Sequence, residues 1–203
     1  MEKGTGVEEH GEAMAMQRKP ATYADLEALP ENVVGELIEG VLYVSPRPAA
    51  PHTMAATQLA SELVGPFNRG RGGPGGWIIL FEPELHLGKD ALVPDLAGWR
   101  QERMPEPLRT TAFTLAPDWV CEVLSPSTAA LDRSVKLRVY AREGVQHVWL
   151  LDPELRTLEV FRLDKGRYTL LVTHTGKARV RAEPFEALEL ELVYLWGEKP
   201  PVP

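Results

Sequence analysis

The sequence predicts an α/β or α+β domain in which a mixed β-sheet is flanked by helices. Short apolar, strand-like runs recur along the chain, and turn residues separate them. Two stretches of helical composition, residues 51–67 and 129–144, interrupt these runs. The run 118–125 is mostly apolar, as a strand covered on both faces requires. These features predict helices packed on a mixed sheet, with an N-terminal hairpin and additional C-terminal strands.

The length and composition are those of one globular domain. The chain has 203 residues, of which 44% are hydrophobic and 25% are charged. It contains no apolar run long enough to span a bilayer, and its first residues lack the features of a signal peptide. Cys121 is the only cysteine and lies in an apolar stretch, so we expect a buried, reduced thiol. These observations predict a soluble cytoplasmic protein without a membrane partner.

Acidic residues are concentrated at the two ends of the chain, whose net charge is -7. Residues 1–39 carry nine acids and three bases, and residues 183–203 carry five acids and one base. The middle, residues 40–182, therefore holds 18 bases and 15 acids, a net charge of +3 that permits a phosphate-binding face. We expect residues 1–20 to be disordered, residues 21–197 to form one domain, and residues 198–203 to be a tail.

The first half of the chain predicts a short helix, a hairpin, a longer helix and three strands. Residues 22–25 resemble a weak helix N-cap, and residues 33–46 predict a hairpin that turns at Glu39-Gly40. Pro51 opens the longer helix, and a glycine-rich loop without a P-loop pattern follows at 69–76. The apolar positions of this helix are Met54, Leu59 and Leu63. The strands follow at 77–82, 84–88 and 92–99.

The second half begins with a long connection over residues 100–117, before the strand at 118–125. The helix at 129–144 is stopped by Gly144. Strands joined by short turns are predicted at 148–153, 157–163 and 167–174. The apolar segment 188–196 is a candidate for a last strand.

Two carboxylates stand in apolar surroundings where a core without a site would not place them. Asp95 follows Val93-Pro94 at the start of an apolar strand, and Glu122 interrupts the run 118–125. Burying a carboxylate is costly unless it is paired, hydrogen-bonded or bound to a metal. Strand alternation places Glu122 on one face with Val120 and Leu124. The alternatives are that Asp95 caps a turn or starts a strand, and that Glu122 forms a buried salt bridge to Arg133 or Lys136.

Lys136 is the third candidate residue. At about 100° per residue, it falls between Val139 and Tyr140 at the edge of the buried helix face, whereas Arg138 and Arg142 point to solvent. The turn after residue 124 brings this helix back over the sheet, where the ammonium group can approach the carboxylates. The alternative is a helical pair with Asp132, four residues earlier.

Carboxylates that converge at strand ends suit a hard, oxygen-preferring cation such as Mg²⁺ or Mn²⁺. Such an ion generates hydroxide from water and stabilises charge on a phosphoryl group, and a nearby lysine orients the water or balances the charge. The five histidines are scattered without metal-binding spacing, which argues against zinc.

At these positions the chain resembles the bacterial Uma-type family of restriction-endonuclease-like proteins. The matching strings are Pro94-Asp95, Glu122-Val123-Leu124-Ser125-Pro126-Ser127-Thr128, and Lys136-Leu137 with Tyr140. Upstream, residues 36–40, 45–48 and His52 look like the N-terminal block of the same family. The resemblance runs from about residue 20 to about residue 165, and its most specific string is the one that begins at Glu122.

The resemblance implies the PD-(D/E)xK nuclease fold, a mixed sheet flanked by helices. In that superfamily the residues matching Asp95 and Glu122 bind Mg²⁺, often with the backbone carbonyl matching Val123. The catalytic lysine of the superfamily stands two residues after the glutamate, where this chain has Leu124. The resemblance suggests that the lysine has moved to the helix as Lys136. Nucleases of this superfamily often pair as dimers, and residues 188–196 offer either such an interface or a last strand of the sheet.

Four other residues carry weaker expectations. Glu36 is an additional candidate metal ligand or else an exposed hairpin acid, and His52 is a candidate substrate contact or else a structural residue of the first helical turn. Arg47 is either a phosphate contact or a solvated surface residue, and Tyr140 is expected in the core.

The leading expectation is a Mg²⁺- or Mn²⁺-dependent nuclease that hydrolyses phosphodiester bonds of DNA through Asp95, Glu122 and Lys136. The rival expectation is a catalytically weak or inactive binding or regulatory module that kept the nuclease fold, because a fold does not establish an activity. A hydrolase of a non-nucleic phosphodiester would use the same site chemistry.

Overall fold

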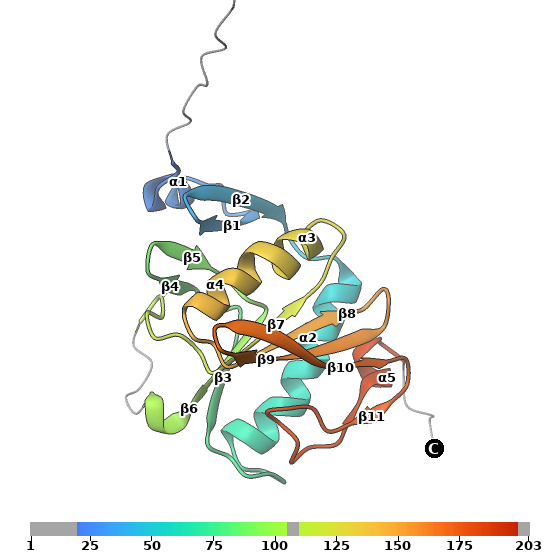
Figure 1. Cartoon of the computed structure of the whole chain (residues 1–203). Helices are drawn as coiled ribbons and strands as arrows, with labels where there is room; N and C mark the ends of the chain where they lie inside the picture. The colour runs from blue at the N-terminus through green and yellow to red at the C-terminus, as the bar shows by residue number, and fades with distance from the viewer. Residues whose placement is uncertain (1–19, 105–109, 199–203) are drawn as a thin grey trace, which may run out of the picture.

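A six-stranded mixed sheet forms the centre of the molecule (Figure 1). The computed structural model describes residues 20–104 and 110–198, and in it the strand order of this sheet is β10-β9-β8-β7-β6-β3. The strands are β3 (Trp77–Phe81), β6 (Leu96–Arg100), β7 (Trp119–Val123), β8 (His147–Asp152), β9 (Thr157–Asp164) and β10 (Arg167–Thr175). β7 and β8 are parallel, and the other neighbours are antiparallel. The predicted mixed sheet is thereby confirmed.

A smaller sheet of order β2-β1-β5-β4 lies beside the first. Its strands are β1 (Val33–Ile38), β2 (Val41–Pro46), β4 (Leu85–Leu87) and β5 (Asp90–Leu92). The predicted hairpin is correct, since β1 and β2 pair from Val33↔Pro46 to Ile38↔Val41 around a turn in which Glu39 and Gly40 both have positive φ. The short helix α1 (Tyr23–Glu27) is also present, and the Asp25 carboxylate accepts the backbone N–H of Thr22.

The segment 92–99, predicted as one strand, is divided between the two sheets. β5 ends at Leu92 in the smaller sheet and β6 begins at Leu96 in the larger one. Pro94 has no N–H for a ladder hydrogen bond, and the Val93 N–H donates to the Glu36 carboxylate instead (2.9 Å). Asp95 therefore lies where the chain passes from one sheet to the other.

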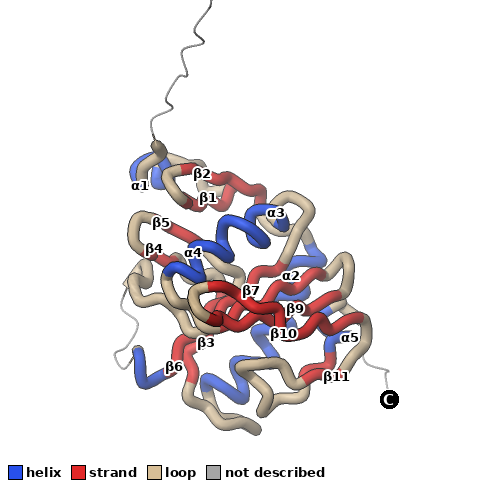
Figure 2. Tube along the Cα trace, in the orientation of Figure 1, coloured by secondary structure: helices blue, strands red, loops and turns tan. Residues whose placement is uncertain are grey.

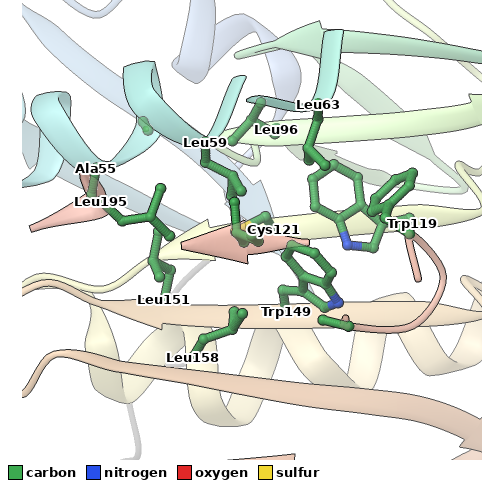
Figure 3. Packing of buried hydrophobic residues seen from close by; sticks show 14 of the residues in the cluster. Ala55, Leu59, Leu63, Leu96, Trp119, Cys121, Trp149, Leu151, Leu158 and Leu195 are labelled. Carbon is green, nitrogen blue, oxygen red and sulfur yellow. The ribbon is translucent and has the colours of Figure 1, made fainter. Parts of the chain in front are cut away.

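One face of the large sheet is covered by α2 (Ala50–Leu63), which continues as a π-helical turn, η1 (Val64–Asn68). The helix buries Ala55, Ala56, Leu59 and Leu63. These residues pack with side chains of the sheet that include Trp119, Cys121, Trp149 and Leu151 (Figure 3). Of the apolar positions named for this helix, Leu59 and Leu63 are buried, whereas Met54 is 45% exposed. Cys121 is buried as predicted, and burial raises the pKa of its thiol well above the usual value.

The other face is covered by the helical segment that follows β7. It comprises α3 (Ala129–Leu131), the π-helical turn η3 (Asp132–Lys136) and α4 (Leu137–Arg142), drawn as blue helix in Figure 2. Val139 and Tyr140 pack with Val120, Leu124 and Val148 of the sheet face. The predicted helix is confirmed with its stop at Gly144 (φ 78°), whereas the π-helical turn was not predicted.

The C-terminal segment differs from its prediction. Residues 188–196 add no strand to the large sheet: Leu190–Glu191 form β12, paired with β11 (Arg179–Val180), and Leu192–Leu195 form the helix α5. Leu190, Leu192 and Leu195 are buried in the cluster that includes the inner face of α2. The segment therefore packs against α2 and does not extend the large sheet.

The predicted disorder of residues 1–20 and the tail at 198–203 fall almost entirely outside the described residues. Within the described part of the chain, no helix is both long and apolar enough to cross a membrane.

Candidate functional site

A cavity of about 300 Å³ opens where the two sheets meet. Its walls come from the β1–β2 hairpin, the start of α2, the break before β6 and the turn after β7. All five residues predicted for the site line it: Glu36, His52, Asp95, Glu122 and Lys136. The structure thus brings together side chains that lie up to 100 positions apart in the sequence.

Asp95 is fixed by two contacts at the start of β6. Its Oδ2 accepts the backbone N–H of Val123 (2.6 Å), and its Oδ1 lies 3.1 Å from His52 Nε2. The hydrogen bond to Val123 crosses between the antiparallel neighbours β6 and β7, so it sets the position of Asp95 relative to the strand that carries Glu122. The side chain does not cap a local turn, because its partners lie in β7 and α2, but Asp95 does directly precede the first residue of β6, as the alternative of a strand start states.

Glu122 projects from β7 into the face that also holds Val120 and Leu124, as strand alternation predicted. Only 2% of its surface is exposed. Its Oε1 accepts the Tyr140 hydroxyl (2.5 Å) and lies 3.0 Å from Lys136 Nζ. The expectation of a core position for Tyr140 is confirmed, and its hydroxyl also orients the Glu122 carboxylate.

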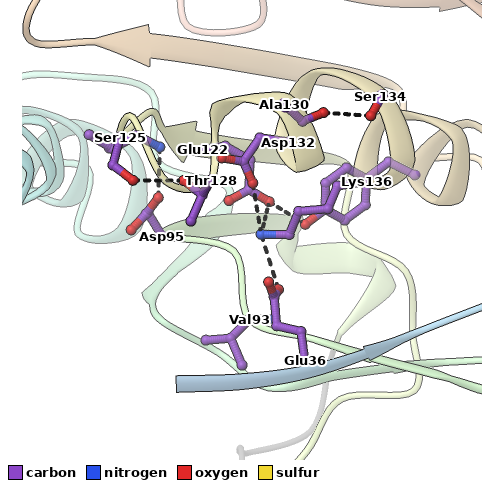
Figure 4. Close-up of polar contacts among 12 residues, drawn as sticks. Glu36, Val93, Asp95, Glu122, Ser125, Thr128, Ala130, Asp132, Ser134 and Lys136 are labelled. Atoms are coloured by element: carbon purple, nitrogen blue, oxygen red, sulfur yellow. Dashed lines mark hydrogen bonds and ion pairs between the residues drawn. The ribbon is translucent and has the colours of Figure 1, made fainter. Parts of the chain in front are cut away.

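Lys136 lies at the centre of a carboxylate cluster (Figure 4). Its Nζ is 3.0 Å from Glu36, 3.0 Å from Glu122 and 3.3 Å from Asp132. An ammonium group has three donors, and three carboxylates surround this one. The side chain is 4% exposed and therefore fully inside the buried face, not at its edge as predicted. The π-helical turn that ends at Lys136 changes the angular position of the residues after Leu131, which a regular 100° projection does not include.

The structural alternatives weighed for Lys136 and Glu122 are both realised. The helical pair with Asp132 exists, and so does the buried salt bridge of Glu122 to Lys136. Arg133 is not involved, since it pairs with Glu159. The same lysine thus contacts carboxylates from three different elements.

Glu36 is not an exposed hairpin acid, since it is 8% exposed and faces the cavity. Its Oε1 accepts the Val93 N–H and pairs with Lys136. The hairpin therefore contributes a carboxylate to the same cluster as the large sheet.

His52 lies in the first turn of α2 and pairs with Asp95. Burial is the largest single influence and lowers its pKa, but the hydrogen bond and the charge of Asp95, with Asp132 and Glu82, outweigh burial and raise the pKa above the usual value. Its Nδ1 is buried and has no hydrogen-bond partner among the described residues.

Negative charge is in excess within the cavity. The described residues that line it include five carboxylates but two permanent cations, Arg47 and Lys136. Burial, opposed by Lys136 and reinforced by the neighbouring carboxylates Asp132, Asp95 and Glu36, raises the pKa of Glu122 well above its usual value. Burial lowers the pKa of Lys136, but Glu122 and Glu36 outweigh it, so the pKa is raised and the ammonium stays charged.

Two acids of the cavity were missed as site residues. Asp132 was considered only as a helical partner of Lys136, yet it is 2% exposed and burial raises its pKa. Glu82, at the end of β3, also lines the cavity, and burial followed by the charge of Asp95 raises its pKa. The spacing in the sequence places Asp132 beside Lys136, but it does not show that both side chains face the cavity.

The donor chemistry of this cavity fits Mg²⁺ or Mn²⁺. Carboxylate oxygens are the ligands these ions prefer, and Mg²⁺ usually needs one or two of them because it keeps several waters. The excess of buried negative charge is what a divalent cation would offset. Within residues 20–104 and 110–198, no group of three His, Cys, Asp or Glu side chains is arranged to hold an ion. Glu36, Glu122 and Asp132 converge on the Lys136 ammonium instead.

Comparison with known proteins shows the family to which the chain belongs. The family model Uma2, described as a putative restriction endonuclease, matches residues 20–193. The chain therefore belongs to the Uma2 family. No curated protein matches the sequence.

A solved structure shares the fold. It is the crystal structure of a protein described as a putative nuclease belonging to DUF820 from Anabaena variabilis ATCC 29413. The two chains are 24% identical, the match covers 88% of this chain and 98% of the other, and the TM-score is 0.70. This likeness confirms the fold class that the resemblance implied.

Proposed function

We propose that the chain is a divalent-metal-dependent nuclease that hydrolyses phosphodiester bonds of DNA. The observation that carries the proposal is the convergence of Asp95, Glu122 and Lys136 in one cavity with an excess of carboxylates. Membership of a family described as a restriction endonuclease supports nucleic acid, and DNA in particular, as the substrate.

Asp95 and Glu122 would hold Mg²⁺ or Mn²⁺, with Glu36 as an additional ligand and the Val123 carbonyl as a further oxygen. A divalent ion held by these residues would lower the pKa of a bound water and would offset negative charge on the phosphoryl group. The carboxylates keep their orientation through protein contacts: the Val123 N–H holds Asp95, and the Tyr140 hydroxyl holds Glu122. A carboxylate has about four acceptor sites, so these bonds leave capacity for an ion.

Lys136 would position the attacking water or balance the developing negative charge. Its raised pKa keeps it charged, which suits charge balance better than proton removal. His52, paired with Asp95, would restrain that carboxylate from the opposite side of the Val123 bond.

The test is calorimetric titration of Mn²⁺ into the wild type, Asp95→Asn and the control Asp164→Asn, with plasmid nicking assayed on the same samples. Asp164 is an exposed carboxylate at the end of β9, so its variant has the same charge change far from the cavity. We expect Asp95→Asn to abolish both metal binding and nicking, and Asp164→Asn to leave both unchanged.

One observation also favours the rival function, a non-catalytic module. Each of the three donors of the Lys136 ammonium group has a carboxylate partner, so these residues can be held together without a metal. A correctly folded wild type that binds no Mn²⁺ would support that module. Metal binding with cleavage of small phosphodiesters but not of DNA would instead indicate a non-nucleic substrate.

A homodimer and a cytoplasmic location stay predictions from the sequence. Within residues 188–196, which were considered for a dimer interface, Leu190, Leu192 and Leu195 are buried inside the fold.

A further inference from the structure

We propose that the Lys136 ammonium group and a divalent ion compete for the carboxylates of Glu36 and Glu122, and that Asp132 is the positioning residue that keeps the ammonium group in the cavity when an ion takes the other two. The inference rests on the metal binding of the proposed function and describes how that site is regulated. It follows from the donors of the ammonium group, from the contacts that hold each carboxylate, and from the spacing of Asp132 and Lys136.

All three donors of the Lys136 ammonium group have carboxylate partners in the structure. The Nζ atom lies 3.0 Å from Glu36 Oε1, 3.0 Å from Glu122 Oε1 and 3.3 Å from Asp132 Oδ1 (Figure 4). The Lys136 side chain is 4% exposed, and those of Glu122 and Asp132 are each 3% exposed, so solvent screens these contacts little. In this arrangement the ammonium group has no donor left for a phosphate oxygen of the substrate.

An ion bound by Glu36 and Glu122 would lie close to the Lys136 ammonium group, which contacts the same two carboxylates. Two neighbouring cations repel each other strongly in a buried site. The ion carries twice the charge of the ammonium group, and the carboxylates of this cluster outnumber the ammonium group, so the ion offsets more of the buried negative charge. An ion that binds these carboxylates therefore weakens their contacts with Lys136.

The ammonium group can move more easily than the two carboxylates. Glu36 accepts the backbone N–H of Val93 (2.9 Å), and Glu122 accepts the hydroxyl of the buried Tyr140 (2.5 Å). Lys136 reaches both carboxylates through a flexible four-carbon stem. The two carboxylates therefore keep their places, and the ammonium group moves away from them.

Asp132 is the partner that the ammonium group can retain. It stands four residues before Lys136 in the same helical segment, so this pair does not depend on how the two sheets lie. Thr128 holds Asp132 through a side-chain hydrogen bond, and the Asp132 N–H donates to the Thr128 carbonyl (2.9 Å). With Asp132 as its one carboxylate partner, the ammonium group has donors free for a phosphate oxygen. Lys136 thus becomes available to the substrate once the ion is bound.

The first experiment is calorimetric titration of Mn²⁺, without DNA and at one alkaline pH, into the wild type, Lys136→Met and the control Arg138→Met. Arg138 is exposed, pairs with Glu39 and does not line the cavity, so its variant has the same charge change outside the cluster. We expect Lys136→Met to bind Mn²⁺ at least about tenfold more tightly than the wild type. Arg138→Met should bind it as the wild type does. Unchanged or weaker binding by Lys136→Met, or an equal gain in the control, would overturn the competition.

A second measurement uses the wild type and so does not depend on the stability of the variant. Nuclear magnetic resonance of isotope-labelled lysine side chains detects buried ammonium groups, and Lys136 is the one buried lysine among the described residues. Mg²⁺ should speed the exchange of the ammonium hydrogens with water, because the group loses two of its three carboxylate partners. Exchange that stays the same or slows when Mg²⁺ saturates the protein would contradict the competition.

The role of Asp132 is tested with Asp132→Asn, alone and together with Lys136→Met. Without the Asp132 charge the ammonium group depends on Glu36 and Glu122 alone, and it then competes more strongly with the ion. We expect Asp132→Asn to weaken Mn²⁺ binding at least about threefold more when Lys136 is present than in the Lys136→Met background. An equal loss in both backgrounds would make Asp132 a ligand of the ion and would overturn its positioning role.

Plasmid nicking, assayed on the same samples, separates this inference from the proposed function. If the wild type nicks DNA but Lys136→Met binds Mn²⁺ no more tightly, the nuclease proposal stands and the competition fails. If no sample nicks DNA but Lys136→Met binds Mn²⁺ more tightly, the nuclease proposal fails and the competition stands.

Discussion

Lys136 is the residue on which the electrostatics of the cavity depend. Its ammonium touches carboxylates from β1, from β7 and from its own π-helical turn. Each carboxylate is buried, so each depends on this lysine for compensation. Removing one partner of a buried pair costs far more than removing one partner of an exposed pair, because the remaining charge stays uncompensated.

We predict that Lys136→Met lowers the free energy of unfolding of the metal-free protein by about 3–5 kcal/mol. Arg138→Met, which breaks the exposed pair with Glu39, should cost less than about 1 kcal/mol. Urea unfolding at neutral pH measures both. Because the cost comes from uncompensated carboxylates, saturating Mn²⁺ should recover more stability in Lys136→Met than in the wild type. Similar small losses in both variants would contradict this account.

Glu122 gives the cluster its pH dependence. Because burial raises its pKa in the folded state above the usual 4.5, the folded chain binds more protons than the unfolded chain between the two pKa values. In that window the stability of the metal-free protein falls as pH rises. Metal binding requires the deprotonated carboxylate, so Mn²⁺ affinity changes in the opposite direction.

We therefore predict that Mn²⁺ affinity rises with pH over the range in which the Glu122 carboxyl group loses its proton, with release of protons on binding. The increase in melting temperature caused by Mn²⁺ should grow over the same range. Calorimetry in two buffers of different ionisation enthalpy measures the released protons directly. An affinity that does not change with pH would show that the ion is bound by groups other than a carboxyl with a raised pKa.

At the residue scale, the sequence was sufficient to predict that Asp95 and Glu122 have polar partners inside the fold, because a carboxylate in apolar surroundings is costly without a partner. It was not sufficient for the burial of Glu36 or for the role of Asp132. Those depend on which elements lie opposite one another, and strand alternation or helix spacing does not contain that information. Lys136 lies inside the buried helix face and not at its edge because of a local feature, the π-helical turn. The pattern of residues in the sequence does not predict this turn.

Among the elements, the C-terminal segment shows where periodicity alone misleads. Residues 188–196 alternate apolar and acidic residues at first and so look like a strand, yet only Leu190–Glu191 form one, and Leu192–Leu195 form the helix α5 against α2. Leu190 and Leu192 keep the alternation through β12, and Leu195 follows three residues later. A pattern this short fits both the two-residue period of a strand and the 3.6-residue period of a helix. The surface against which the segment packs therefore decides which of the two it forms.

We predict that Leu195→Ala lowers the free energy of unfolding by about 2–5 kcal/mol, as for other buried leucines. Leu155→Ala, a truncation of the same size at a residue that is 70% exposed, should have an effect of less than about 0.5 kcal/mol. Sedimentation at the same concentrations should show no change in oligomeric state for either variant. A Leu195→Ala protein that keeps its monomer stability but loses self-association would instead make this segment a dimer interface.

At the scale of the whole molecule, the cavity lies where the two sheets meet. The larger sheet contributes Asp95 and Glu122, and the smaller one contributes Glu36. The order of elements along the chain predicted the larger sheet and both of its helical layers. The smaller sheet was predicted only as a hairpin, because the division of residues 92–99 between two sheets depends on a long-range hydrogen bond from Val93 to Glu36.

This arrangement predicts that a bound ion couples the two sheets. If Glu36 and Glu122 both hold it, Mn²⁺ should slow hydrogen exchange in β1 and β2 as well as in the helical segment 129–142, while β10 at the far edge of the larger sheet stays unchanged. Glu36→Gln keeps an oxygen that can accept the Val93 N–H but removes the charge. In this variant Mn²⁺ should still protect residues 129–142 and should no longer protect the hairpin. Loss of protection in both segments would mean that Glu36 is needed to form the whole site, and an unprotected hairpin in the wild type would exclude Glu36 as a ligand.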